Sequence, residues 1–213
     1  LPADGGKTHL SVERRMATHA RTTEPPDPER LARWRREMRA EDREAFEAFC
    51  MEQTGWLSDY ALFMALDARH GSRWTRWPEP LAQRQPDALA AAREQHAETI
   101  GFWSFVQWRF LVQWRRLREH AHARGVRMVG DAPIFVAHHS ADVWANASQF
   151  FLDAQGEPTV VAGVPPDYFS ATGQLWGNPL YKWSAHQKTN YEWWIERFRS
   201  VLSLVDIVRL DHF

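Results

Sequence analysis

The chain has 213 residues, of which 44% are hydrophobic and 25% charged, a composition typical of a globular protein or of part of a larger one. Its net charge of -1 gives no general electrostatic case for binding nucleic acid or an anionic membrane, and no apolar run approaches the ~18 residues of a membrane span. The single cysteine, Cys50, excludes an internal disulfide framework, so we expect a cytoplasmic protein in which this thiol is buried and structural.

The first half of the chain is predicted to be helical. Residues 1–26 are polar and basic and are expected to be irregular, and the chain starts without methionine or a signal-peptide pattern, so we expect a cut or processed terminus. Residues 27–53 open with aspartate and proline, which suit an N-cap and the first helical position. A second helix is expected around residues 56–64, ending at Gly71, with Tyr60 in the core by its helical phase.

A third helical stretch is predicted over residues 86–124. The sequence allows a break near Gly101, and Gly125 is typical of the glycine that follows a helix. Residues 27–125 therefore form the expected helical subdomain, after the irregular segment 1–26.

The second half predicts parallel β/α units. A short apolar strand at residues 126–129, expected to be buried, leads to Asp131. A helix over residues 190–204, capped by its first residue, is followed by a second buried strand at 205–210 that leads to Asp211. Two copies of helix, strand and carboxylate indicate an α/β fold with parallel strands. In a closed barrel of such strands, both carboxyl ends open on one face, where catalytic groups are usually found.

A long insertion separates the two strands within the predicted segment 126–213. It covers residues 132–185 and contains an expected hairpin over residues 150–161 that turns at Gln155 and Gly156. The remainder is rich in glycine, proline and aromatic residues, which is typical of a functional lid or a binding loop.

The 12 tryptophans admit two interpretations. Most could pack in the core, or some could stack on the C–H faces of sugar rings. Composition alone leaves both open.

Four motifs in order carry a resemblance to a known family. They are Gly130-Asp131-Ala132-Pro133-Ile134, Val164-Pro165-Pro166-Asp167-Tyr168-Phe169-Ser170, Trp176-Gly177-Asn178-Pro179 and Val208-Arg209-Leu210-Asp211-His212-Phe213, and the match extends back to Trp56-Leu57-Ser58-Asp59-Tyr60. Across about residues 46–213 the chain resembles the amylomaltases, the 4-α-glucanotransferases of glycoside hydrolase family 77. The resemblance implies a fragment of a (β/α)8 barrel, with this chain supplying about its third and fourth strands and neither the acid/base glutamate nor the third carboxylate.

By this resemblance, Asp211 is the nucleophile of a retaining reaction, because it matches the family's carboxylate at the end of a strand. Arg209 stands two residues earlier, so both side chains project from the same face of the strand. Its guanidinium would orient Asp211 and keep it ionised. From spacing alone, an ordinary ion pair at the mouth of a barrel is an equal alternative.

The resemblance also implies substrate-binding residues around the nucleophile. His212 matches a histidine that hydrogen-bonds a sugar hydroxyl, and Asp131 matches an aspartate that organises the pocket, although a loop-capping role would suit it nearly as well. Tyr168 and Phe169 match aromatic residues of a loop that overhangs the acceptor side of the groove. Such a loop would exclude water and favour transfer over hydrolysis.

Three further residues match sugar-contacting positions of the family. Trp176 and Asn178 match a pair in the same loop, and packing is the alternative for the tryptophan. Asp59, on the early helix, matches a sugar-lining segment less securely.

One position departs from the family. Residue His139 stands where family members usually have an acidic residue, which puts the local hydrogen bonding in doubt. The neighbouring His138 would complete a histidine pair, but no further ligands accompany it in the sequence, so we expect no metal ion. No organic cofactor is implied either.

Together these observations predict a cytoplasmic transferase that acts on maltooligosaccharides derived from starch or glycogen, without nucleic-acid or membrane partners. The 213-residue piece is itself expected to be inactive, because the acid/base residue lies outside it. The rival interpretations are a hydrolase of the same clan and a non-catalytic glucan-binding protein; a metal-dependent barrel with Asp131 and Asp211 as ligands is a more remote one.

Overall fold

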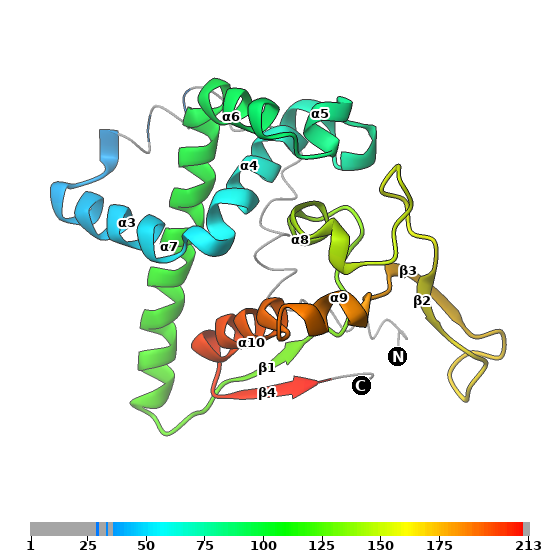
Figure 1. Ribbon diagram of the computed structural model, residues 1–213. Coiled ribbons are helices and arrows are strands. Elements are labelled where there is room, and N and C mark those ends of the chain that lie inside the picture. The colour runs from blue at the N-terminus through cyan, green and yellow to red at the C-terminus, as the bar shows by residue number, and fades with distance from the viewer. Residues whose placement is uncertain (1–28, 30–32, 34–35, 211–213) are drawn as a thin grey trace. The chain divides into compact units, whose positions relative to one another are not determined.

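Figure 1 shows the computed structural model, which describes residues 29, 33 and 36–210. The described residues fall into two compact units. Of the described residues, 114–134 and 193–210 belong to the first unit, and 29, 33, 36–113 and 135–192 belong to the second. The long helix α7 (Ala97–His122) contributes its last part to the first unit and the rest to the second. The three segments expected from the sequence divide the chain differently, and their boundaries stay a prediction.

The first unit contains a pair of parallel strands followed along the chain by catalytic candidates. Strand β1 (Val129–Ala132) pairs with β4 (Ile207–Leu210), and helix α10 (Glu192–Leu204) leads directly into β4 (Figure 1). In the register, Asp131 lies opposite Arg209. The predicted α/β fold and its parallel strand pair are therefore confirmed.

Both strands begin later than predicted. The amide of Val126 still donates to Ala121 O (3.0 Å) in the turn that ends α7, so β1 starts three residues further on. The amide of Val205 donates to Val201 O (3.2 Å), which continues the helical pattern of α10 and moves the start of β4 to Ile207.

The prediction that the two strands are buried is wrong for the described residues. Val129 is 65% exposed and Ile207 is 41% exposed. Among the residues that the structure describes, this sheet has only two strands. The outer edge of each strand therefore has no neighbouring strand.

The second unit is mainly helical. Its regular elements before the insertion are α3 (Ala40–Glu52), α4 (Thr54–His70), η1 (Trp74–Arg76), α5 (Glu79–Ala82), α6 (Pro86–Gln95) and most of α7. Helix α4 provides the core, with seven buried residues, and it packs against α3 and against α8 (Ala141–Ala145). It ends at Gly71 (φ 83°), as predicted.

Helix boundaries differ from the prediction in three places. The helix expected over residues 27–53 is interrupted at residues 38–39, and its predicted start at Asp27 lies outside the described residues. The third stretch breaks at His96 instead of Gly101. Residue Asn190 does not cap α10 in the extended conformation typical of an N-cap: it has a φ of 51° and belongs to the turn before the helix.

Aromatic residues fill the core of the second unit. Trp77 contacts Phe63 and Trp144, with ring centroids 5.2 Å and 5.6 Å apart, and all three are buried. The buried tryptophans across the described residues are Trp74, Trp77, Trp103, Trp108, Trp144 and Trp194. For these six, the packing interpretation is the one the structure supports. Cys50 is half-buried, and burial raises the pKa of its thiol above the usual value.

The insertion is an ordered structure instead of an extended loop. It contains α8, η2 (Ala147–Gln149), α9 (Trp183–Lys188) and an antiparallel ribbon of β2 (Val161–Val164) and β3 (Gln174–Pro179). The expected turn at Gln155 and Gly156 is present, closed by the Asp153 amide donating to Glu157 O (2.9 Å), but the flanking hairpin is reduced to a single bridge.

No described helix is long and apolar enough to cross a membrane.

Candidate active site

The carboxyl ends of β1 and β4 bring two of the predicted site residues together. Arg209 donates from Nε to Asp131 Oδ1 (2.7 Å) and from Nη2 to Asp131 Oδ2 (3.2 Å). This two-point geometry fixes the plane of both groups. The side chains are 30% and 53% exposed for Asp131 and Arg209, so the pair adds little to stability but can meet a solute.

Helix α10 holds the segment that follows β1. Arg197 donates a hydrogen bond to Pro133 O, directly beyond the end of the strand. Its guanidinium lies over the rings of Trp193 and Trp194, 5.2 Å and 5.0 Å from their centroids. These cation–π contacts fix the arginine and therefore the chain just beyond Asp131.

The predicted nucleophile Asp211 and the sugar-binding candidate His212 lie outside the described residues. Their roles stay predictions. The structure does show Arg209, two residues before Asp211, facing Asp131 across the strand pair, a partner that the sequence analysis had not assigned to it.

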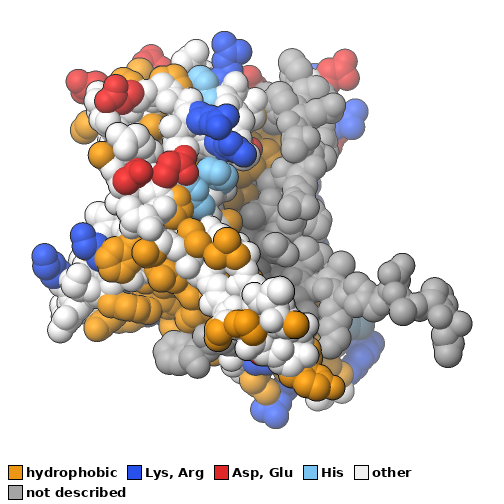
Figure 2. Space-filling view, turned by 90° about the vertical axis from the view of Figure 1, so that its right-hand side faces the viewer, with side chains coloured by type: hydrophobic (Ala, Val, Ile, Leu, Met, Phe, Trp, Pro, Cys, Tyr) orange, Lys and Arg blue, Asp and Glu red, His pale blue; other side chains and the backbone are white. Residues whose placement is uncertain are grey.

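The β2–β3 ribbon presents the most exposed aromatic residues of the candidate set. Tyr168 is 97% exposed and Phe169 is 87% exposed, in the loop between the two strands. Their rings meet edge to face with centroids 5.6 Å apart. Hydrophobic side chains are visible on the surface of the face shown in Figure 2. Tyr168 and Phe169 thus form an aromatic surface that folding of the unit does not cover.

A neighbouring aspartate orders this aromatic pair. Asp167 Oδ1 accepts hydrogen bonds from the amides of Phe169 (2.9 Å) and Ser170 (2.8 Å). Ser170 Oγ in turn donates to the carbonyl of Gly173 (2.7 Å). The sequence analysis did not assign a role to Asp167, although an aspartate bonded to the amide two residues ahead is a recognised turn signal.

Trp176 and Asn178 lie on β3 and contact the segment that opens the insertion. Asn178 Nδ2 donates to Val136 O (2.8 Å), and the Trp176 ring lies 6.1 Å from that of Phe135. Trp176 Nε1 donates to Gln174 Oε1 (3.0 Å). Both side chains are half-buried, so they join the ribbon to residues 135–136 while keeping part of their surface accessible.

Asp59 has a structural environment. Its Oδ2 accepts from Arg84 (2.8 Å) and its Oδ1 from Arg93 (2.9 Å), so this carboxylate links α4 to the residues before and within α6. Tyr60, predicted to lie in the core, is half-buried: its hydroxyl accepts from Gln107 (3.0 Å), and burial raises its pKa. The sugar-binding role of Asp59 stays a prediction, and it would have to compete with two arginines.

The departure at His139 leaves an uncompensated polar atom. His139 Nδ1 is buried and has no hydrogen-bond partner among the described residues, and the ring lies 4.4 Å from that of His138. Burial lowers the pKa of His139, and the neighbouring His138 lowers it further, while Glu157 partly opposes this change. His138 is otherwise engaged, since its Nε2 lies 2.7 Å from Gly156 O. Within the described residues no group of three or more His, Cys, Asp or Glu side chains is placed to hold a metal ion.

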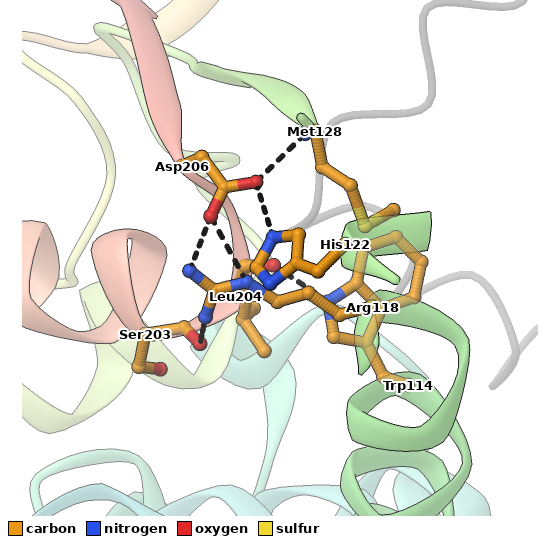
Figure 3. Close-up of polar contacts among 7 residues, drawn as sticks. All are labelled: Trp114, Arg118, His122, Met128, Ser203, Leu204 and Asp206. Atoms are coloured by element: carbon orange, nitrogen blue, oxygen red, sulfur yellow. Dashed lines mark hydrogen bonds and ion pairs between the residues drawn. The ribbon is translucent and has the colours of Figure 1, made fainter. Parts of the chain in front are cut away.

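A second ionic cluster, which the sequence analysis missed, lies at the opposite ends of the same two strands. It is centred on Asp206 and involves Arg118 and His122 of α7 (Figure 3). Its signal in the sequence is the spacing of Trp114, Arg118 and His122, which places the three side chains on one stripe of a helix. The sequence analysis gave Asp206 no role.

Comparisons with known proteins agree on one family. The sequence model of the 4-alpha-glucanotransferases of glycoside hydrolase family 77 matches residues 24–213. The 4-alpha-glucanotransferase of Thermus thermophilus is 53% identical over 81% of this chain and 35% of its own length, and that of Synechocystis is 45% identical over 86% and 37%. The solved amylomaltase from Streptococcus agalactiae in complex with acarbose has a TM-score of 0.77 and 36% identity, over 82% of this chain and 36% of that one. The chain spans about a third of the length of these relatives, and it belongs to the 4-alpha-glucanotransferase family.

Proposed function

We propose that the protein transfers α-1,4-glucan segments between maltooligosaccharides with retention of configuration at the anomeric carbon. The observation that carries the proposal is the pairing of Asp131 and Arg209 at the carboxyl ends of adjacent parallel strands, with Asp211 two residues beyond. Polar groups at this edge of parallel strands are where barrel enzymes place their chemistry. The family membership supports the same reading.

In the proposed reaction, Asp211 attacks the anomeric carbon of the donor glucan and forms a covalent glycosyl-enzyme. The 4-hydroxyl of a second glucan then displaces the carboxylate, and the two inversions give net retention. Protonation of the leaving oxygen requires a general acid, which the family resemblance places outside this chain. Because Arg209 is held at two points by Asp131, its position is fixed before substrate binds, and a fixed cation favours the ionised nucleophile.

Transfer prevails over hydrolysis only when a sugar hydroxyl reaches the intermediate before water does. The exposed pair of Tyr168 and Phe169 offers flat apolar surface to a glucan chain, and aromatic rings suit the C–H faces of pyranoses. The turn made by Asp167 holds this pair in one arrangement, which lowers the entropic cost of binding an acceptor.

The wider assignment follows from the same argument. The substrates are maltooligosaccharides and related α-1,4-glucans from starch or glycogen. The complete enzyme forms a (β/α)8 barrel to which β1 and β4 contribute neighbouring strands. The chemistry uses carboxylates and needs neither an organic cofactor nor a metal ion. A single cysteine suits the reducing cytoplasm.

The test is incubation of the protein, expressed from its complete coding sequence, with pure maltotriose, followed by separation of the products by size. Glucose together with maltopentaose and longer oligomers is the expected result, and Asp211→Asn should abolish both. Glucose and maltose without longer products would indicate a hydrolase. Absence of any turnover, with maltotriose still bound, would indicate a glucan-binding protein.

A further inference from the structure

Helix α7 presents a polar stripe to the junction between α10 and β4. Trp114 Nε1 donates to Leu204 O (2.7 Å), and Arg118 Nη1 donates to Ser203 O (2.9 Å) (Figure 3). Both acceptors belong to the last turn of α10, whose carbonyls have no partners within the helix. The stripe therefore fixes the point at which the helix ends and the strand begins.

The Asp206 side chain occupies the centre of this junction. Its Oδ1 accepts from Arg118 Nη2 (2.6 Å) and Nε (3.2 Å), and its Oδ2 lies 2.8 Å from His122 Nε2. Oδ2 also accepts from the backbone amide of Met128 (2.8 Å). The carboxylate is only 14% exposed, and each of its oxygens has two contacts (Figure 3).

The Met128 backbone is bound by Asp206 from both sides. While its amide donates to the Asp206 carboxylate, its carbonyl accepts from the amides of Asp206 (2.9 Å) and Ile207 (3.2 Å). Met128 immediately precedes β1, and Ile207 is the first residue of β4. These hydrogen bonds join the two segments just before the first paired residues, Val129 and Ile207. They set the register that continues to Asp131 and Arg209.

We propose that Asp206 is a positioning residue for glucan transfer, which sets the register of β4 on β1 and thereby the placement of Arg209 and Asp211. Arg209 follows Asp206 by three residues, which in a strand is about 10 Å. A slip of one residue would turn Arg209 to the other face of the sheet, away from Asp131. This inference rests on the proposed function, because it assigns Asp206 a consequence for the reaction and not only for folding.

The experiment measures kcat and KM for maltotriose in the protein expressed from its complete coding sequence, well below each variant's melting temperature. Asp206→Asn keeps the shape but replaces an accepting oxygen by a donor that opposes Arg118, His122 or the Met128 amide. We expect kcat to fall by roughly 10-fold to 100-fold, the effect of a small misplacement of reacting groups, with a much smaller change in KM. Glu196→Gln is the control, because Glu196 lies on the exposed surface of α10 and pairs only with Arg199 among the described residues; its kcat should not change.

A second measurement separates positioning from mere stabilisation. In an Arg209→Lys background, Asp206→Asn should cost much less in kcat, because both changes act on the same placement. Equal losses in both backgrounds, or a folded Asp206→Asn protein with unchanged kcat, would overturn the proposal. If Asp206→Asn does not fold, Arg118→Lys and His122→Gln replace it, and unchanged kcat in both overturns the proposal equally. Failure of the unmodified protein to lengthen maltotriose would instead refute the proposed function, and the positioning role with it.

Discussion

Gly130→Ala should destabilise the protein, because the added methyl group on β1 would come too close to the side chain of Val205. A Cβ atom at this position would lie 2.8 Å from Val205 Cγ1 and 3.1 Å from Cγ2. Carbon atoms in proteins normally stay about 3.5–4.0 Å apart, so one side must move by about 0.7 Å. Val205 is 3% exposed and β-branched, which leaves its side chain little freedom to turn away.

The expected cost is that of overpacking a closed site, about 1–3 kcal/mol. In a domain of roughly 150–250 residues this corresponds to about 2–4 °C in melting temperature for each kcal/mol. Calorimetry and urea unfolding of the unmodified protein and of Gly130→Ala would measure it. Gly55→Ala is the matched control, because a Cβ at Gly55 meets nothing within 4 Å and alanine is the better helix former in α4.

The cause can be tested with a double substitution. Val205→Ala removes both clashing methyl groups and leaves the Cβ of residue 205 at 3.4 Å from the new methyl group, which is ordinary van der Waals contact. The penalty of Gly130→Ala should therefore largely disappear in the Val205→Ala background, a coupling of about 1–3 kcal/mol. An unchanged melting temperature for Gly130→Ala, or the same penalty in both backgrounds, would refute the steric argument.

Three further predictions concern the ionic and aromatic groups. The Met128 amide, Arg118 and His122 hold the pKa of Asp206 well below its usual range, so its contribution to stability is complete above the ordinary carboxyl pKa of about 3.9 and is lost as the pH falls toward the lowered pKa. Urea midpoints measured across this acid range should thus fall less steeply in Asp206→Asn, and parallel curves would contradict the assignment. Asp59→Asn should lower the free energy of unfolding by about 1 kcal/mol, the scale of partly exposed ion pairs, and unchanged stability would contradict this. A raised KM for maltotriose in the same variant would support the predicted sugar-binding role of Asp59, and an unchanged KM would contradict it. Tyr168→Ala and Phe169→Ala should leave the melting temperature unchanged, since both side chains are exposed, but raise the share of hydrolysis products, and an unaltered ratio of long oligomers to glucose would argue against their role in acceptor binding.

Local signals in the sequence predicted most of the helices and strands, but they did not predict which side chains contact one another. Gly71 ends α4 as predicted, and Gly125 lies in the turn that follows α7; both have a positive φ, which glycine adopts without steric cost. Asn190 misled the prediction, because asparagine suits both an N-cap and a left-handed turn, and here it adopts the second. Such ambiguities are resolved by the chain around a residue and not by its type.

The ion pair of the candidate site shows the limit more clearly. Alternation along one strand placed Arg209 on the same face as Asp211, and the sequence analysis paired those two. The structure shows that Arg209 also pairs with Asp131, which lies 78 positions earlier, while its predicted action on Asp211 falls outside the described residues and stays a prediction. That contact depends on the register between two strands, and the register is set by Met128, Asp206 and Val205, whose partners are equally distant in sequence.

The two ends of this short strand pair carry charged clusters that differ in their exposure to solvent. At the amino ends, Asp206 is 14% exposed, and its hydrogen bonds and ion pairs are all made within the protein. These contacts stabilise the register of the two strands. At the carboxyl ends, Asp131 and Arg209 are 30% and 53% exposed, which weakens their mutual attraction but leaves them open to a sugar or a neighbouring carboxylate. Side chains that bind a substrate must stay accessible. They therefore cannot also be buried in the contacts that hold the strands together. The rigidity that the proposed function requires of Arg209 is therefore supplied about 10 Å away, at the opposite end of the strands.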